Sequence, residues 1–406
     1  MSSIAIIGAG QAGMQLADSL RRGGFEGSVI LYGDEGSLPY QRPPLSKQFL
    51  LGDLEASRLN FRPIAHYEKL AVTLRLDCAV TQVDLQTRTL AMANGEQAAF
   101  DRLAFTTGAR VRKLALPGAE DPRVCYLRGI TDAQAIRERL ATARRVVIIG
   151  GGFIGLEVAA VARTLGKEVT VLEAQTRLMP RVVAPVVSAY FEAVHNQRGV
   201  RFLLGESLTA LAPTSSALGL TTASATYLEA DLVVVGIGVH PNLELAAAAG
   251  LPCEGGIVVN EFACTRDPTV VAAGDCTWQR NILFERPHRL ESVQNAVDQA
   301  KVAAASLLEK PVAYSQVPWF WSDQYDVKLQ MVGISTGFEA AIVRGNPETG
   351  AFSVFYYLGE RVLAVDSINR PAEHMAARRL LASGGLLAKE LAADPAADLK
   401  TIIEKN

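Results

Sequence analysis

The sequence predicts an α/β fold in which two parallel-sheet domains are followed by a third domain of α+β type. The first observation is a repeat, IAIIGAGQAG at residues 4–13 and VVIIGGGFIG at residues 146–155. The second is a change near Trp319, where alternating strand and helix patterns give way to successive hairpins. The third is the length, since 406 residues suit two or three domains.

Each copy of the repeat is typical of a strand, a glycine turn, a helix and a second strand. The apolar run before the first glycine suits a buried parallel strand, and the period near 3.6 that follows suits a helix packed on the sheet. The match continues past the glycines, because Ala17 corresponds to Ala159 and Gly24 to Gly166, and SVILYGDE parallels EVTVLEA. We therefore expect two Rossmann-like domains.

The segments between and after the repeats have their own patterns. Residues 80–105 alternate around Asn94-Gly95, which predicts a small antiparallel insertion, and residues 131–143 suit a helix. A strand over 231–238 leads to Pro241-Asn242, where we expect the chain to return to the first domain.

From Trp319 onward the runs VKLQMVG, AAIVRG, FSVFYYL and VLAVDSI predict strands, and a helix is expected from Pro371. The predicted division is therefore a discontinuous first domain of residues 1–110 and 242–318, a second of 111–241 and a C-terminal α+β domain of 319–406.

Composition and charge exclude several classes of protein. Lys and Arg total 40 against 42 Asp and Glu, so a net charge of −2 supplies no global field for nucleic acid. The five cysteines show neither a CxxC motif nor metal-ligand spacing, and we predict no metal site.

We expect a cytoplasmic protein with no export signal, since MSSIAIIGAG lacks a basic start and passes directly into the glycine motif. The longest uncharged run, residues 207–228, contains Pro213 and many Ser and Thr residues, which suit short strands and turns.

The glycines of each repeat suit a dinucleotide. The first permits a tight turn, the second lets the backbone approach a pyrophosphate at the helix N-terminus, and the third lets helix and strand pack closely. One such motif is weak evidence, but two purely structural turns would require the same coincidence twice. The predicted binding glycines are Gly8, Gly10 and Gly13 in the first copy and Gly150, Gly152 and Gly155 in the second.

Acidic residues about 20 positions after the first glycines complete the pattern, because they accept hydrogen bonds from ribose hydroxyls. They are Asp34 or Glu35 in the first copy and Glu173 in the second. Glu173 would repel a 2'-phosphate, so we expect the second site to prefer NADH, although Arg177 leaves that preference open. Residues 265–275, TRDPTVVAAGD, place Asp275 after a buried strand and a glycine, where it suits ribitol hydroxyls, so FAD is expected at the first site.

The strand ending AxGD and the pair Thr107-Gly108 resemble the flavoproteins with two dinucleotide-binding domains, which share the glutathione-reductase-like fold. The resemblance covers the whole chain. Members that use a redox disulfide carry a cysteine pair soon after the first Rossmann unit, whereas this chain has no cysteine between Met1 and Cys78. Electrons are therefore expected to pass from the flavin directly to an external acceptor.

The segments PYQRPPLSK, VVIIGGGFIGLEVAA, LESVQNA and PWFWSDQY resemble the ferredoxin reductases of oxygenase systems, of the putidaredoxin reductase type. This resemblance implies an FAD-dependent NADH:ferredoxin oxidoreductase. NADH gives a hydride to FAD, and electrons pass singly to a [2Fe-2S] ferredoxin that supplies a haem monooxygenase or a Rieske dioxygenase.

The resemblance also implies roles for individual residues. Lys47 is expected near the flavin ring, where an ammonium stabilises the reduced form, and Glu157 is expected to pair with it and orient the nicotinamide. Lys47 as an exposed lysine, Glu157 as a carboxylate favoured by the helix dipole, and Arg128 as a surface ion pair stay open as alternatives. The remaining implied contacts are Ala12, Asp34, Val80, Arg128, Asp275 and Val293 for FAD and Ile154 for NAD.

Trp319 and Trp321 are expected beside the flavin, with Trp321 between flavin and ferredoxin, although core packing is an alternative for both. A basic face for an acidic ferredoxin is expected at Lys301, His374, Arg378 and Arg379, each of which also suits a solvated helix surface. A monomer is expected.

Two other functions stay open. A rubredoxin reductase or an NADH oxidase would use the same cofactors with another acceptor. A signalling flavoprotein similar to apoptosis-inducing factor would bind nucleic acid or proteins, but its positive surface is not evident in this composition.

Overall fold

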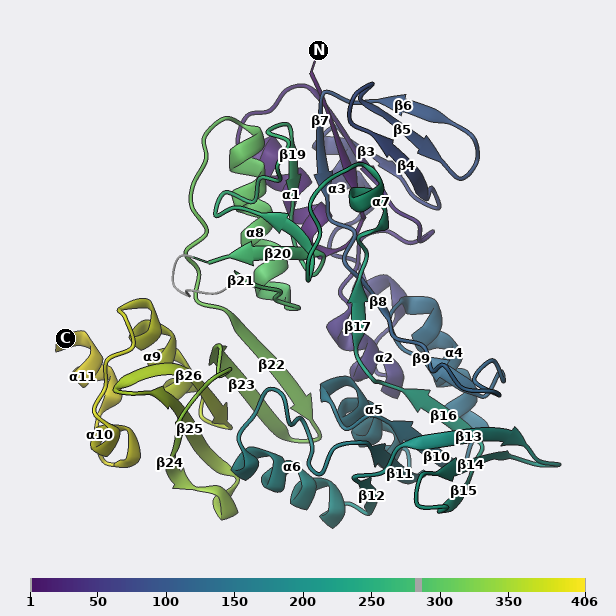
Figure 1. Ribbon diagram of the computed structural model, residues 1–406, viewed down its shortest axis with the longest axis vertical. Helices are drawn as coiled ribbons and strands as arrows, with labels where there is room; N and C mark the ends of the chain where they lie inside the picture. Colours follow the sequence, from purple (N-terminus) through teal and green to yellow (C-terminus); the bar gives the residue numbers. More distant parts are fainter. Residues whose placement is uncertain (1, 282–286, 406) are drawn as a thin grey trace. The chain divides into compact units, whose positions relative to one another are not determined.

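The computed structural model describes residues 2–281 and 287–405. The chain forms two compact units. Figure 1 shows the elements of the chain, coloured from the N-terminus to the C-terminus. The first unit contains Met1–Gln41, Ser57–Arg110 and Val239–Pro318; the second contains Arg42–Ala56, Val111–Gly238 and Trp319–Asn406. The three-domain division drawn from the sequence stays a prediction.

The first unit is built on a parallel sheet in the order β19-β7-β1-β2-β3. Helices α1 and α8 pack against each other beside this sheet (Figure 1), and small apolar residues such as Ala17 and Ala300 fill their contact. The elements are β1 (Ser3–Ile7), α1 (Gln11–Arg22), β2 (Ser28–Tyr32), η2 (Ala56–Leu59), α3 (Ile64–Lys69), β3 (Val72–Arg75), β7 (Arg102–Phe105), β19 (Val270–Ala272) and α8 (Val293–Leu307).

Smaller elements complete the first unit. The predicted antiparallel insertion is confirmed as the sheet β4-β5-β6, while the last residues of that segment form β7 of the parallel sheet. A second small sheet has the order β18-β20-β21, and β8 pairs with β17. Their bounds are β4 (Val80–Asp84), β5 (Thr89–Met92), β6 (Gln97–Ala99), β8 (Ala109–Val111), β17 (Val239–Pro241), α7 (Glu244–Ala248), β18 (Ile257–Val259), β20 (Thr277–Arg280) and β21 (Pro287–His288).

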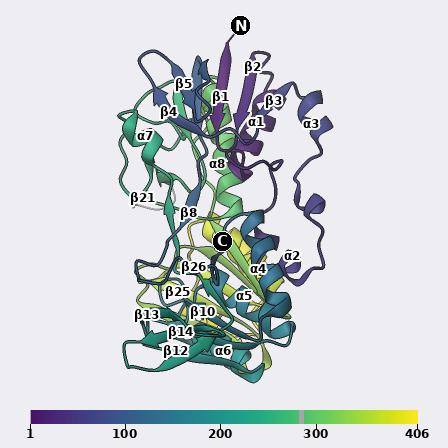
Figure 2. The ribbon, with the colours of Figure 1, turned by 90° about the vertical axis from the view of Figure 1, so that its right-hand side faces the viewer.

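The second unit repeats the parallel arrangement, with the strand order β12-β11-β10-β16-β9. Helices α4 and α5 lie beside these strands (Figure 2), and the uncharged run near residue 215 forms the antiparallel sheet β13-β14-β15. The elements are β9 (Val124–Tyr126), α4 (Ile130–Thr142), β10 (Arg145–Ile149), α5 (Phe153–Thr164), β11 (Glu168–Glu173), α6 (Pro185–Gln197), β12 (Val200–Leu204), β13 (Leu208–Pro213), β14 (Leu218–Thr222), β15 (Tyr227–Ala230) and β16 (Leu232–Val235).

A short segment, η1 (Pro43–Ser46) and α2 (Gln48–Leu51), belongs to this second unit although it is distant in sequence. It contacts α4 and α5. Phe49 and Leu50 are fully buried, and the Arg137 guanidinium lies 5.1 Å from the centre of the Phe49 ring. Burial of these two apolar side chains fixes Lys47, which lies between η1 and α2.

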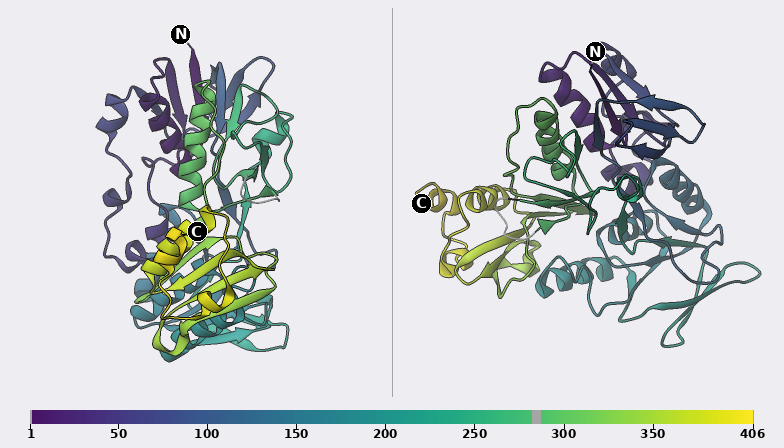
Figure 3. Two further views of the ribbon diagram at one scale, coloured as in Figure 1. Left: turned by 90° about the vertical axis from the view of Figure 1, so that its left-hand side faces the viewer. Right: turned by 45° about the horizontal axis from the view of Figure 1, so that its top comes forward.

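The C-terminal part of the second unit is an antiparallel sheet in the order β22-β23-β26-β25-β24. Helix α9 lies along its strands (Figure 3), which confirms the predicted hairpins and the helix from Pro371. The elements are β22 (Trp319–Gln324), β23 (Val327–Gly333), β24 (Ala340–Asn346), η3 (Pro347–Thr349), β25 (Ala351–Leu358), β26 (Arg361–Ile368), α9 (Pro371–Ala382), α10 (Lys389–Ala393) and α11 (Leu399–Lys405).

A shared core joins this sheet to the parallel sheet's helices, because Leu156 and Phe191 pack in one cluster with Phe352 and Tyr356. Over residues 2–281 and 287–405, no helix has the length and apolar character needed to cross a membrane. All five cysteines are free.

Candidate functional site

The first glycine turn connects β1 to α1 and leaves an open space at its second glycine. Gly8 has φ +114°, and a Cβ there would lie 2.2 Å from the Thr106 carbonyl oxygen; a Cβ at Gly13 would lie 2.0 Å from that of Gly8. A Cβ at Gly10 would meet no atom within 4 Å. The outer glycines therefore serve close packing, while Gly10 leaves room where a dinucleotide phosphate would approach.

The second glycine turn, between β10 and α5, has the same geometry. Gly150 has φ +108° and would place a Cβ 2.5 Å from the Gly236 carbonyl oxygen, and Gly155 would place one 2.1 Å from that of Gly150. Gly152 again faces open space. Gly10 and Gly152 are the N-cap residues of α1 and α5 and offer no capping side chain, so the first N–H groups are oriented for an anion. Both turns fit the diphosphates of FAD and NADH.

Acidic groups surround the first turn. Asp34 is exposed just past β2, and the Glu35 carboxylate accepts a hydrogen bond from the Tyr40 hydroxyl at 2.5 Å. Asp275 follows Gly274, whose φ is +89° and whose Cβ would lie 3.2 Å from the Ala12 Cβ. The structure therefore brings the Asp275 turn against the start of α1.

The remaining predicted FAD contacts occupy scattered positions. Val80 opens β4, and Val293 is the first residue of α8, whose N-cap Ser292 accepts from the Asn295 N–H. Arg128 lies in the second unit, where its carbonyl accepts from Arg42 at 2.9 Å and its N–H donates to Asp132 at 2.9 Å. Their contacts with FAD stay predictions.

Backbone N–H groups hold the Glu173 carboxylate at the second glycine turn. Its Oε2 accepts from the Gly151 N–H at 2.6 Å, and its Oε1 accepts from the Gln175 N–H at 2.8 Å. Arg177 instead donates to the carbonyls of Pro180 and Val183 and to the Ser188 hydroxyl. The guanidinium thus ties down the loop before α6, which weakens the case for 2'-phosphate recognition by Arg177. Ile154 is 43% exposed in the first turn of α5.

Lys47 and Glu157 form an ion pair, with 2.7 Å between Nζ and Oε2. Glu157 is 2% exposed. Ser46 donates to Oε2 at 2.5 Å and Ser322 donates to Oε1 at 2.6 Å. Burial raises the pKa of Glu157, and Lys47 and the two serine hydroxyls oppose that rise. The Glu157 carboxylate therefore depends on these three donors to stay ionised. Such a set of partners goes beyond the alternative that Glu157 is a carboxylate favoured only by the helix dipole.

Sequence reasoning missed Ser46 and Ser322, which complete this cluster. The available signal was the alternation in PWFWSDQY, because Phe320, Ser322 and Gln324 share one face of β22. Two polar side chains on a buried face require partners in the packed domain.

Trp319 and Trp321 lie on the opposite face of β22, with ring centres 5.6 Å apart, and the Arg378 guanidinium lies 5.2 Å from the Trp319 ring centre. His374 is only 2% exposed, and burial lowers its pKa to about 4, so the expectation that it adds to a basic face is wrong. His374 instead packs edge-on against Trp319. Lys301, in the first unit, pairs with Asp298 at 2.9 Å, and Arg379 is exposed on α9.

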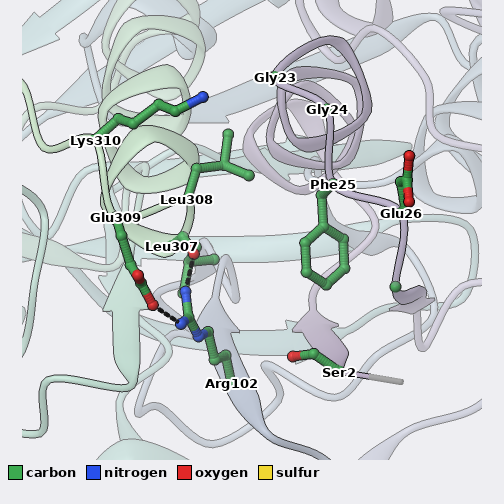
Figure 4. Close-up of a pocket in the computed structure, with 11 residues that line it drawn as sticks. Ser2, Gly23, Gly24, Phe25, Glu26, Arg102, Leu307, Leu308, Glu309 and Lys310 are labelled. Carbon is green, nitrogen blue, oxygen red and sulfur yellow. Dashed lines mark hydrogen bonds and ion pairs between the residues drawn. The ribbon is translucent and has the colours of Figure 1, made fainter.

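The cavity in Figure 4, about 660 Å³ in volume, lies outside the candidate site. It is bounded by Ser2 before β1, Arg102 at the start of β7, and the segments that follow α1 and α8. Arg102 bridges the Leu307 carbonyl and Glu309. The cavity therefore adjoins the amino ends of the strands, whereas the glycine turns lie at the carboxyl ends, where ligands of such sheets bind.

Comparisons with known families cover nearly the whole chain. Residues 2–300 match the family described as pyridine nucleotide-disulphide oxidoreductase, and residues 319–403 match the one described as reductase C-terminal.

Individual proteins are also similar over most of their lengths. Rhodocoxin reductase of Rhodococcus erythropolis is 45% identical, covering 100% of this chain and 95% of its own. A rubredoxin-NAD(+) reductase of Pseudomonas putida is 38% identical over 91% of this chain and 96% of its own. The reductase in a covalent putidaredoxin reductase–putidaredoxin complex has a TM-score of 0.96 and 39% identity, covering 100% of this chain and 98% of its own.

Proposed function

We propose, from the premise that the chain belongs to the pyridine nucleotide-disulphide oxidoreductase family, that it is an NADH-dependent ferredoxin reductase with FAD as its cofactor. The observation that carries the proposal is the ion pair between Lys47 and the buried Glu157 carboxylate, beside the second of two complete glycine turns. We infer that this pair of opposite charges orients the nicotinamide and the flavin for hydride transfer.

Bound FAD supplies the redox chemistry, since it accepts a hydride from NADH and gives up the two electrons one at a time. Within the protein, the Gly10 and Gly152 turns bind the diphosphates, and Glu173 accepts from the adenosine ribose while disfavouring a 2'-phosphate. Lys47 stabilises negative charge on the ring, and Glu157 holds Lys47 in place.

The cysteines support a direct protein acceptor. All five are free, and Cys78 and Cys276 are buried; burial raises the pKa of the Cys276 thiol. A buried thiol with a raised pKa is a poor nucleophile, so a dithiol relay is disfavoured. The similarity to the reductase of a putidaredoxin complex supports a ferredoxin as the acceptor, which we propose to be of the [2Fe-2S] type.

The docking surface is proposed to include Trp319 and Trp321 together with Arg378 and Arg379 of the same unit. Lys301, which belongs to the first unit, stays a predicted docking residue. Trp321, half-buried on β22, is proposed to lie on the electron path. A monomeric, cytoplasmic protein fits this role, and the ferredoxin in turn supplies a haem monooxygenase or a Rieske dioxygenase.

The test is an anaerobic spectroscopic titration. We expect NADH to bleach the flavin much faster than NADPH does, and a [2Fe-2S] ferredoxin to be reduced faster than rubredoxin. Trp321→Ala should slow ferredoxin reduction at least tenfold while flavin bleaching is unchanged. Tyr227→Ala, at an exposed aromatic of the same unit, is the control.

A second acceptor class is rubredoxin, which the 38% identical rubredoxin reductase favours. Faster reduction of rubredoxin than of ferredoxin would select it. Flavin bleaching with no reduction of either protein would reject both and favour an oxidase or a signalling flavoprotein.

A further inference from the structure

A row of polar side chains continues from Glu157 into the interior of the second unit. Ser322 Oγ lies 2.6 Å from Glu157 Oε1, Gln324 Nε2 lies 3.2 Å from Ser322 Oγ, and His195 Nε2 lies 2.8 Å from Gln324 Oε1. The Tyr325 hydroxyl lies 3.3 Å from His195 Nδ1. Ser322, Gln324 and His195 are each 0% exposed, so bulk water does not compete for these bonds.

The hydrogen bonds in this row all run in one direction, with each donor pointing toward Glu157. The Gln324 amide donates to Ser322 Oγ, so the single Ser322 proton is free to point at Glu157. The Gln324 oxygen then needs a donor, which requires His195 to carry its proton on Nε2. His195 Nδ1 is left as the acceptor for Tyr325.

The row forms because residues two apart on β22 lie opposite residues four apart on α5. Along β22, Phe320 and Ser322 are two residues apart, and along α5, Phe153 and Glu157 are four apart. Phe320 contacts Phe153 with ring centres 4.9 Å apart, and Ser322 contacts Glu157. The next residue on that face of β22, Gln324, reaches His195 on α6.

The neutral His195 ring can carry its single proton on either of its two nitrogens. Burial lowers its pKa to about 4, with Arg198 adding to the effect, so the ring is neutral near pH 7. Tyr325 and Gln324 contact its two nitrogens, and Arg198 lies over the Tyr325 ring at 4.5 Å. The neutral ring responds to its neighbours by the choice of the protonated nitrogen.

We propose that Ser322, Gln324 and His195 form a directional hydrogen-bond relay that positions the Glu157 carboxylate against Lys47 and couples its charge to the tautomer of His195. With an ionised carboxylate, every donor points toward Glu157. When the group at position 157 is itself a donor, Ser322 accepts from it and donates to the Gln324 oxygen, the Gln324 amide donates to His195 Nε2, and His195 carries its proton on Nδ1. The proposal makes Ser322, Gln324 and His195 positioning residues. Their importance for hydride transfer rests on the proposed function, but the direction of the hydrogen bonds does not.

The test is the protonation of the His195 nitrogens, read by ¹⁵N NMR of the histidine-labelled holoprotein near pH 7. The chain has five histidines, and loss of one signal in His195→Asn assigns the resonance. We expect protonation on Nε2 in the unaltered protein and on Nδ1 in Glu157→Gln. In Ser322→Ala/Glu157→Gln the relay is interrupted, and we expect the single Nδ1 form of His195 to give way to a mixture of the two tautomers.

Ser367→Ala is the matched control, because Ser367 is also fully buried in the C-terminal sheet but bonds Ser353, outside the row. An unchanged tautomer in Glu157→Gln, or the same change in Ser367→Ala, would overturn the relay. Should Glu157→Gln fail to fold, Gln324→Leu serves instead: it must convert the single tautomer to a mixture, and a retained single Nε2 form contradicts the proposal.

The result of the tautomer experiment does not depend on which protein accepts the electrons. A protein that shows the tautomer change but reduces neither ferredoxin nor rubredoxin would refute the proposed function alone. A working reductase with a fixed His195 tautomer would refute the relay alone.

Discussion

The glycine turn after β1 and the one after β10 have the same backbone geometry, but different side chains cover the helices that follow them. Two residues past the third glycine, the first copy has Gln15 and the second has Glu157. Gln15 donates to Ser19 one turn later on its own helix, whereas Glu157 is buried between Lys47, Ser46 and Ser322. The repeat thus supplies two similar turns, both of which we propose to bind phosphate, and segments distant in sequence bury a charged residue on the helix that follows the second turn.

The strands that follow the two helices differ as well. Tyr32 pairs with Ile7 in the first sheet and Leu172 pairs with Ile149 in the second, so Gly33 corresponds to Glu173. Asp34 and Glu35 therefore lie one and two residues further along. A Cβ at Gly33 would lie 2.7 Å from the Ala9 Cβ, whereas the Glu173 carboxylate accepts from Gly151. Because the acid lies at a shifted position, we expect the two turns to hold their ribose groups differently.

The largest effect is expected where the two turns are alike. Gly8→Ala and Gly150→Ala should each destabilise the protein by about 3 kcal/mol or more, because both residues have positive φ and a carbonyl in the way of a Cβ. Thermal unfolding with the FAD-to-protein absorbance ratio measures this. Gly10→Ala and Gly152→Ala are the matched controls: each should fold normally, the first losing FAD and the second only NADH affinity. If Gly10→Ala unfolds like Gly8→Ala, the division of roles is wrong.

The next effect belongs to the C-terminal sheet of the second unit, where the Tyr356 hydroxyl accepts a hydrogen bond from the N–H of Ala184, the N-cap of α6. Burial raises the pKa of Asp366 to about 7, and Tyr356 donates to it. Because the folded state holds this proton more tightly than the unfolded state, its stabilising effect is complete below about pH 4 and is lost as pH rises to 7, a loss of about 4 kcal/mol.

Asp366→Asn removes that titration, so between pH 5 and pH 8 it should lose about 3 kcal/mol less stability than the unaltered protein. Urea unfolding at the two pH values measures the difference. Asp326→Asn, at an exposed position of the same sheet region, is the control. Equal pH dependence in Asp366→Asn and the parent would refute the assignment.

A third prediction compares the surroundings of Glu157 on α5 with those of Gln15, the corresponding residue on α1. Lys47→Met leaves the buried Glu157 carboxylate without its cation and should cost about 3 kcal/mol, while Gln15→Met should change stability by less than about 0.5 kcal/mol. Adding Glu157→Gln to Lys47→Met should restore about half of the loss, since an amide carries no charge to compensate. A thermal double-mutant cycle measures the coupling. Additive effects of the two substitutions would show that the pair is not coupled.

The smallest effect concerns cofactor choice. Glu173→Ala should raise the KM for NADH about tenfold, the equivalent of one lost charged hydrogen bond, and reduce the preference over NADPH. Steady-state kinetics with both nucleotides tests this. Glu35→Ala, at the first turn, should leave the NADH KM unchanged, and a similar rise in that variant would contradict the assignment of separate sites.

Much of the fold was predictable because its signals are local. The glycine repeats, the Asn94-Gly95 turn and the apolar strand runs each act within a few residues, and the structure confirms the elements that they predict. His374 was predicted incorrectly as part of a surface, because a histidine in a helix beside Arg378 is indistinguishable in sequence from an exposed one.

The sequence by itself determined the two strand-turn-helix units, since only glycine fits positive φ at Gly8 and Gly150, and it identified the acid Glu173 at the second turn, which we propose to favour NADH. The tertiary structure alone decided which side chains enclose Glu157. Residues 42–56 join the second unit because Phe49 and Leu50 are buried there, and β22 delivers Ser322 from far along the chain. A buried carboxylate requires donors from whatever packs on it, and packing between segments so distant in sequence leaves no local pattern by which to read it.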